Sequence, residues 1–159
     1  MRFVHSFLWL LFLAAATAST TISVCAEEVT EVLIITNADN TAESKDFQTA
    51  DYRAMFLKEK KTWSDGTEIV AVQLESTTKE AEVFRLKVLD KTEDELTKYW
   101  TDLREDEGVE PPVSKKDSKG VYRTVSGKKN AIGYVAKSYY DGLTAEEKAK
   151  VKILLTLSG

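Results

Sequence analysis

The sequence predicts an α/β fold in which helices cover a mixed sheet. The first observation behind this fold class is an unbroken apolar, β-branched run at residues 32–36, typical of a strand buried on both faces. The second is that three further strand-like runs alternate with segments of helical periodicity. The third is composition: 43% of the 159 residues are hydrophobic, which is enough for one domain with a packed core.

Residues 1–26 have the features of a secretory signal peptide. Arg2 supplies a short positive start, and residues 7–16 form an unbroken apolar run. A helix that spans a bilayer needs about 20 apolar residues, so this run is too short to span but has the length of a signal h-region. We therefore expect a domain of residues 27–159 after the signal, with no stable membrane span.

Small residues provide two candidate cleavage sites, after Ala26 and after Ala18. Cys25 raises an alternative, a lipoprotein signal in which this cysteine is lipidated. A small residue is normally required directly before such a cysteine, and Val24 fits that position poorly. We therefore expect a periplasmic or secreted protein with a cleaved signal peptide, and lipidation is the less favoured alternative.

The first half of the predicted domain alternates strands with helices. After the strand at residues 32–36, apolar residues at helical spacing predict a short helix at residues 49–58. A Ser-Asp-Gly turn then leads to a second strand at residues 68–74. The next helix begins in the sequence Ser-Thr-Thr, where Thr77 and Glu80 have the spacing of a capping box.

The second half continues with longer helices and two more strands. Thr92 begins an amphipathic helix that stops near Gly108, and a pair of prolines then marks an extended segment. A weaker helix at residues 118–126 precedes a third strand at residues 131–135. After one more helical turn, residues 151–157 form the closing strand. The predicted order is β-α-β-α-α-α-β-α-β.

Composition excludes several functional classes. The net charge of -4 lacks the basic surplus of a nucleic-acid-binding protein. The single histidine, His5, and the single cysteine, Cys25, both lie in the predicted signal peptide, so the remaining domain cannot form a His-based triad or an ordinary zinc site. No P-loop, dinucleotide-binding or nucleophile-elbow motif is present. We expect a protein that is not an enzyme and needs no cofactor or metal, with a carboxylate-based hydrolase as a distant alternative.

Three stretches of the chain carry a resemblance to a known family: MFLKEKKTWSDGTEIVAV, KVLDKTEDELTKYWTDLREDEGVEPPV and NAIGYV. They resemble segments of the phosphate ABC transporter substrate-binding proteins, and most closely of their short, single-lobe relatives called PBP-like domain proteins, and they occur in family order and near-family spacing. The resemblance covers about residues 32–157. It implies a type II periplasmic-binding fold, here as a single lobe.

The resemblance also implies an anion site at the loop that follows the second strand. Ser76, Thr77 and Thr78 occupy the position of the family's small and hydroxyl residues, and Lys79 adds positive charge. Asn37, after the first strand, is a second candidate, because open α/β sheets bind ligands beyond the carboxyl ends of their strands. The alternative is that the Ser-Thr-Thr segment serves only as a helix cap.

Some positions depart from the family pattern. Leu74 and Glu75 stand near the place of a family Arg, the loop has no glycine, and Glu75 would repel phosphate. Lys58 stands where the family usually has glycine. Two functions therefore compete: an exported solute-binding protein for phosphate or a related oxyanion, working with an ABC permease or a sensor, and an exported interaction module that kept the fold and lost the ligand.

Four residues of the resembling stretches are expected to have packing roles. Trp63, Tyr99 and Trp100 suit core or domain packing better than ligand contact. Gly133 is expected to permit close packing against a strand. These residues make the family pattern visible without forming a site.

Overall fold

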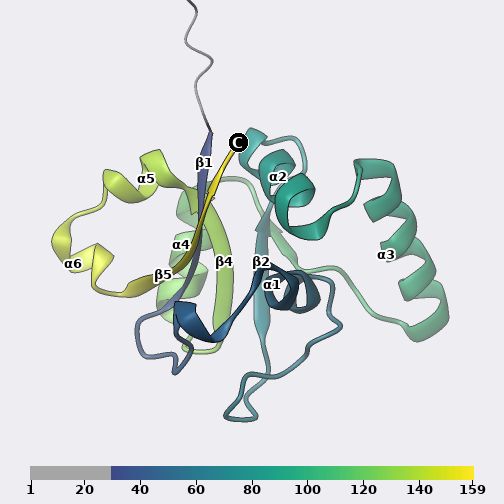
Figure 1. Cartoon of the computed structure of the whole chain (residues 1–159), viewed down its shortest axis with the longest axis horizontal. Coiled ribbons are helices and arrows are strands. Elements are labelled where there is room, and N and C mark those ends of the chain that lie inside the picture. The colour runs from purple at the N-terminus through teal and green to yellow at the C-terminus, as the bar shows by residue number, and fades with distance from the viewer. Residues whose placement is uncertain (1–29) are drawn as a thin grey trace, which may run out of the picture.

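A five-stranded mixed sheet runs through the computed structural model, which describes residues 30–159 (Figure 1). The predicted signal peptide at residues 1–26 lies outside the described residues. The strands are β1 (Glu31–Asn37), β2 (Val70–Leu74), β3 (Val113–Lys115), β4 (Ala131–Ala136) and β5 (Val151–Ser158). Their order in the sheet is β3-β2-β4-β1-β5. The predicted fold class, an α/β domain with a mixed sheet, is confirmed.

The direction of β1 makes the sheet mixed. β1 pairs antiparallel with β4 on one side and with β5 on the other, whereas β2 is parallel to both β3 and β4. The end of β5 therefore lies beside the start of β1, where the Gly159 N–H donates to the Thr30 carbonyl over 3.0 Å (Figure 1). The strands β2, β3 and β4 run in one direction and β1 runs in the other. The carboxyl end of β1 therefore lies beside the amino end of β4, away from the carboxyl ends of β2, β3 and β4.

Helices cover both faces of the sheet. In the view of Figure 1, the first two α-helices lie in front of the sheet and α4 lies behind it. None of the helices between residues 30 and 159 is long and apolar enough to cross a membrane. The helices are η1 (Ser44–Asp46), α1 (Thr49–Phe56), α2 (Lys79–Phe84), the π-helical turn η2 (Arg85–Leu89), α3 (Glu93–Glu107), α4 (Ser118–Gly127), α5 (Lys137–Asp141) and α6 (Ala145–Lys148).

An aromatic cluster joins α1 and α2 to the sheet. The rings of Phe84 and Tyr134 stack with centroids 4.0 Å apart and an interplanar angle of 8°. Phe56 meets the Phe84 ring edge-on at 4.6 Å. Aromatic pairs in these geometries contribute beyond the apolar area that they bury. The cluster therefore fixes the two helices on β4, the strand that carries Tyr134.

Gly133 permits the close approach of α4 to the other face. A Cβ atom at this position would lie 2.6 Å from Cγ1 of Val121 and 3.0 Å from the Val72 carbonyl oxygen. Neither contact is tolerable, because the carbonyl belongs to the neighbouring strand and Val121 is in the core. The predicted packing role of Gly133 is confirmed.

The structure differs from the sequence prediction in four elements. β3 is a strand where only an extended segment was expected, and neither η1 nor α5 was predicted. The capping box of Thr77 with Glu80 is wrong, because Thr78 caps α2: its hydroxyl accepts from the Ala81 N–H at 3.2 Å and donates to the Glu75 carbonyl at 3.0 Å. Adjacent threonines offer the same side chain, so the sequence pattern alone placed the cap one residue too early.

The three aromatic residues predicted to pack are packed. Trp63 is 3% exposed, and its indole N–H donates to the Asn130 carbonyl at 3.0 Å. Trp100 is 7% exposed and meets the Tyr99 ring edge-on at 5.0 Å. The Tyr99 hydroxyl donates to the Leu57 carbonyl at 2.8 Å, which ties α3 to the end of α1.

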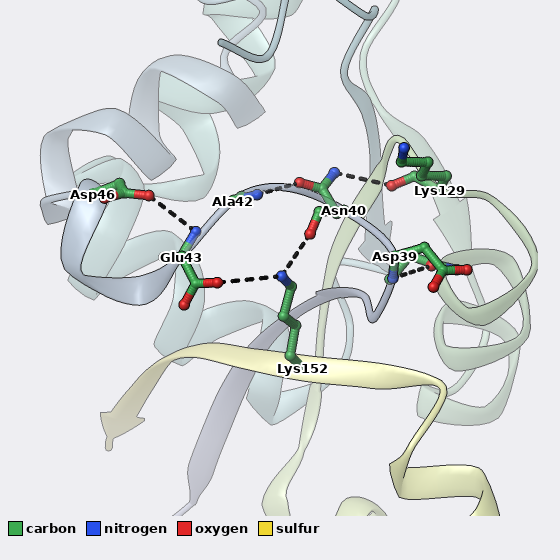
Figure 2. A network of polar contacts seen from close by, with 8 residues as sticks. Asp39, Asn40, Ala42, Glu43, Asp46, Lys129 and Lys152 are labelled. Carbon is green, nitrogen blue, oxygen red and sulfur yellow. Dashed lines mark hydrogen bonds and ion pairs between the residues drawn. The ribbon is translucent and has the colours of Figure 1, made fainter. Parts of the chain in front are cut away.

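A polar network fixes the loop that follows β1 (Figure 2). The buried Asn40 side chain donates to the Lys129 carbonyl at 2.9 Å and accepts from the Ala42 N–H at 2.7 Å. Lys152 of β5 donates to the Asn40 carbonyl and pairs with the Glu43 carboxylate at 3.9 Å. These contacts hold the loop against β5 and against the turn before β4. The polar groups of Asn40 and Lys152 at the carboxyl end of β1 are thus used in structural contacts.

Candidate functional site

The two parts of the predicted anion site, Asn37 and the Ser76–Thr78 loop, lie at opposite ends of the strands of the sheet. Because β1 is antiparallel to β4, Thr36 pairs with Ile132 and Asn37 lies near the start of β4. The loop that begins at Glu75 follows the carboxyl end of β2, which runs parallel to β4. Asn37 and the Ser76–Thr78 loop therefore cannot contact the same small ligand.

The Asn37 side chain is occupied by structural hydrogen bonds. Its amide nitrogen donates to the carbonyls of Val125 and Ser126, both at 3.0 Å, and its oxygen accepts from the Asp39 N–H at 2.9 Å. Asn37 is 6% exposed. These contacts satisfy carbonyls at the end of α4, which a helix leaves without internal partners. The structure thus gives Asn37 a role in anchoring α4 and does not bring it to the other candidates.

The remaining four predicted residues face three different hollows at the carboxyl edge. Ser76 and Thr77 line the largest one. Thr78 lines a second beside the start of α4, and Lys79 lines a third beside Lys137. The Thr78 hydroxyl is already used as the cap of α2. The structure therefore brings only Ser76 and Thr77 together in one cavity.

The cavity that contains Ser76 and Thr77, here called the loop pocket, lies between the end of β2, η2 and α3. Its volume is about 460 Å³. A cavity of this size falls within the range of roughly 300–1,000 Å³ seen for small-molecule sites. The apolar part of its lining comes from four parts of the chain: Leu74, Ala81, Phe84, Leu89, Leu96, Trp100 and Pro111.

A few polar groups line the same pocket. Within residues 30–159, the hydroxyls of Ser76 and Thr77 form no side-chain hydrogen bond, so both are free to meet a ligand. Arg85 of η2 also lines the pocket, and its guanidinium donates to the Lys91 carbonyl at 3.0 Å. That bond uses one of the five N–H donors of the group. The others can turn toward an anion in the pocket.

Polar, acidic and aromatic residues complete the lining, and the polar ones are Gln73, Thr97 and Ser114. Glu75 and Glu93 are exposed and line the pocket together with Arg85. Burial raises the pKa of Tyr134 well above its usual range, so this hydroxyl stays protonated at physiological pH. The charged lining thus contains one cation and two carboxylates, and the carboxylates weaken any purely electrostatic attraction of an anion.

Sequence reasoning missed Arg85 and Trp100 as lining residues. Arg85 lies one helical turn after Ala81, and residues four apart share a helix face, so this spacing could have indicated it. Trp100 reaches the pocket only because α3 folds back beside the end of β2, which no local pattern encodes. In the part of the chain from Thr30 onward, no cluster of three or more acidic, histidine or cysteine side chains is placed to hold a metal ion.

The solved structures with a similar fold include proteins named for phosphate transport. A putative phosphate ABC transporter substrate-binding protein from Clostridium perfringens, with bound phosphate, is 18% identical, with a TM-score of 0.54 over 82% of this chain and 55% of that one. PstS from Borrelia burgdorferi is 15% identical, with a TM-score of 0.58 over 79% of this chain and 47% of that one.

An ABC-type phosphate transport receptor from Vibrio cholerae is 13% identical, with a TM-score of 0.57 over 79% of this chain and 46% of that one. The chain thus spans about half the length of these structures. No known family model matches the sequence, and no curated protein has a significantly similar one. The resemblance seen in the sequence is confirmed at the level of the fold.

Proposed function

We propose that this chain is an exported solute-binding protein that holds a small oxyanion, such as phosphate, in the loop pocket. The observation that carries the proposal is that Ser76, Thr77 and Arg85 line one pocket beyond the carboxyl end of β2. Hydroxyls and a guanidinium are strong donors to oxyanion oxygens. The phosphate proteins that share this fold support the same class of ligand.

The proposed contact set keeps only those predicted residues that line the loop pocket, Ser76 and Thr77. Thr78 and Lys79 are not part of the proposed contact set, because the first caps α2 and the second lines a neighbouring hollow. Arg85 takes the place of Lys79 as the cation. Export through the predicted signal peptide would place the protein in the periplasm or outside the cell, where an ABC permease or a sensor is the expected partner.

Titration with inorganic phosphate tests this proposal directly. We expect Ser76→Ala and Arg85→Gln each to weaken phosphate binding about tenfold or more, because a hydrogen bond to a charged group contributes about 1.5–3 kcal/mol. Ser64→Ala, in the exposed turn at the other edge of the sheet, is the matched control and should leave the affinity unchanged. If both pocket variants titrate like the wild-type protein, phosphate does not bind in the loop pocket.

A second candidate function is an exported interaction module that kept the fold without a solute. The charge of α3 favours it, because the helix carries seven acidic and two basic residues and therefore a net charge of -5. An acidic face suits a basic protein partner and opposes an anion. If neither the wild-type protein nor Glu75→Lys responds to millimolar phosphate, this second function becomes the better account of the chain.

A further inference from the structure

We infer that the loop pocket takes an organic oxyanion, in which the anionic group is joined to an apolar substituent. The inference rests on the proposed function for the position of the anionic group, next to Ser76, Thr77 and Arg85. It goes further in naming what fills the remainder of the cavity. The observations that carry it are the size of the pocket, the distribution of its lining and the balance of its charges.

The pocket is larger than inorganic phosphate requires. A volume of about 460 Å³ lies within the range of roughly 300–1,000 Å³ that suits drug-sized ligands. Phosphate is one tetrahedral group and would leave most of that space to water. Water against an apolar wall is unfavourable, so a ligand that displaces it gains affinity.

The apolar part of the lining offers a surface for a substituent. Leu96 and Trp100 project from α3, Leu89 ends η2, and Pro111 precedes β3. The stacked rings of Phe84 and Tyr134 add an aromatic wall that is fixed by its own packing. A flat or branched apolar group placed here would contact rigid side chains, and rigid contacts lose little conformational entropy on binding.

The charges of the pocket lead to the same conclusion. Glu75 and Glu93 carry the charge opposite to that of Arg85, and their exposure lets solvent and salt screen part of their repulsion of an anion. They lower the affinity for an anionic group by itself. Substantial affinity in this pocket must therefore come from apolar contact, with the hydroxyls and Arg85 setting the orientation of the ligand.

Three probes separate the two parts of the ligand: inorganic phosphate, phenyl phosphate and neutral benzyl alcohol. Each is titrated at about pH 8, where both phosphate compounds carry nearly their full charge because a phosphate ester has its second pKa near 6. Chemical shifts of the two described indole N–H groups report the site. Trp100 lines the pocket, and Trp63, at the opposite end of β2, is the internal reference.

We expect phenyl phosphate to bind at least about tenfold more tightly than inorganic phosphate, a difference of about 1.4 kcal/mol. The Trp100 signal should shift and the Trp63 signal should not. Leu96→Asn should remove most of the advantage of phenyl phosphate and leave inorganic phosphate unaffected. Leu86→Asn is the matched control, since Leu86 is 50% exposed and lies outside the pocket.

Each outcome separates this inference from the proposed function. Equal affinities for the two phosphate compounds, both lowered by Ser76→Ala, would overturn the organic ligand and leave oxyanion binding intact. Binding of benzyl alcohol as tight as phenyl phosphate would show a purely apolar site and overturn the inference. No response to any probe would overturn the inference and the proposed function together.

Discussion

Lys58 shows at the scale of one residue how the structure explains a departure from the family pattern. Its φ is +62°, in the left-handed region, and it follows Leu57, the C-cap residue of α1. This conformation places Cβ close to the following carbonyl oxygen in any residue except glycine. Glycine, which the resembling family usually has here, adopts it freely. Lys58 therefore carries backbone strain that the family pattern avoids.

Replacing Lys58 with glycine should therefore stabilise the protein. We expect Lys58→Gly to raise the free energy of unfolding by about 1 kcal/mol, measured by urea denaturation, because the strain of the left-handed residue is removed. Lys128→Gly is the control: Lys128 is likewise a lysine at the end of a helix, but it is exposed and its φ is -133°. A gain at both positions would show that loss of a lysine, and not backbone relief, explains the change.

The elements differ in how far the sequence predicts them. The four strands with apolar, β-branched runs were predicted, since burial imposes their pattern. β3 was missed because it is a short edge strand whose Val113 is 57% exposed, so no burial pattern marks it. The site was predicted less well than the fold. The sequence places both Asn37 and the Ser-Thr-Thr loop after a strand. It does not reveal that β1 runs antiparallel to β4 and β5, which separates Asn37 from the loop.

The adjacent threonines at the start of α2 have different roles: Thr78 caps the helix, and Thr77 is proposed to bind the ligand. Thr78→Ala should lower the free energy of unfolding by about 1 kcal/mol, because the Ala81 N–H loses its acceptor. Thr77→Ala should leave stability nearly unchanged and weaken oxyanion binding. Urea denaturation of both variants, together with phosphate titration, checks the pair. The assignment fails if Thr77→Ala is the destabilising change.

The two capping boxes of α3 and α6 make stability depend on pH. Hydrogen bonds from the Thr92 and Thr144 backbone and hydroxyl groups lower the pKa of Glu95 and of Glu147, respectively. A carboxylate with a lowered folded-state pKa stabilises the fold above its unfolded pKa of about 4.3, and this contribution is lost as the pH falls through the lower folded value.

We therefore expect the stability of the wild-type protein to decline as the pH falls below about 4.3. The double variant Glu95→Gln and Glu147→Gln should have a smaller decline over the same window, because neither amide titrates. Thermal melts from pH 7 to pH 3 measure the difference. Identical pH profiles would mean that these boxes do not contribute to the acid sensitivity.

At the scale of the whole molecule, one continuous core links every strand of the sheet except the short edge strand β3. Val32, Leu33, Ile34 and Ile35 of β1 are all buried, and β1 lies between β4 and β5. The core therefore depends on β1, which begins at Glu31, a few residues after the predicted signal peptide. Cleavage within β1 would disrupt a buried strand that pairs on both sides, whereas cleavage after Ala26 or Ala18 would leave β1 whole.

The protein recovered after export should therefore begin at residue 27 or 19 and retain the full sheet. Intact mass of the exported protein should show the loss of residues 1–26 or 1–18, without the added mass of a lipid on Cys25. A recombinant chain of residues 27–159 should unfold in a single cooperative transition, since small domains with one core usually do. A soluble exported protein that retains Met1 would contradict the signal-peptide prediction, and two separate transitions would contradict the single core.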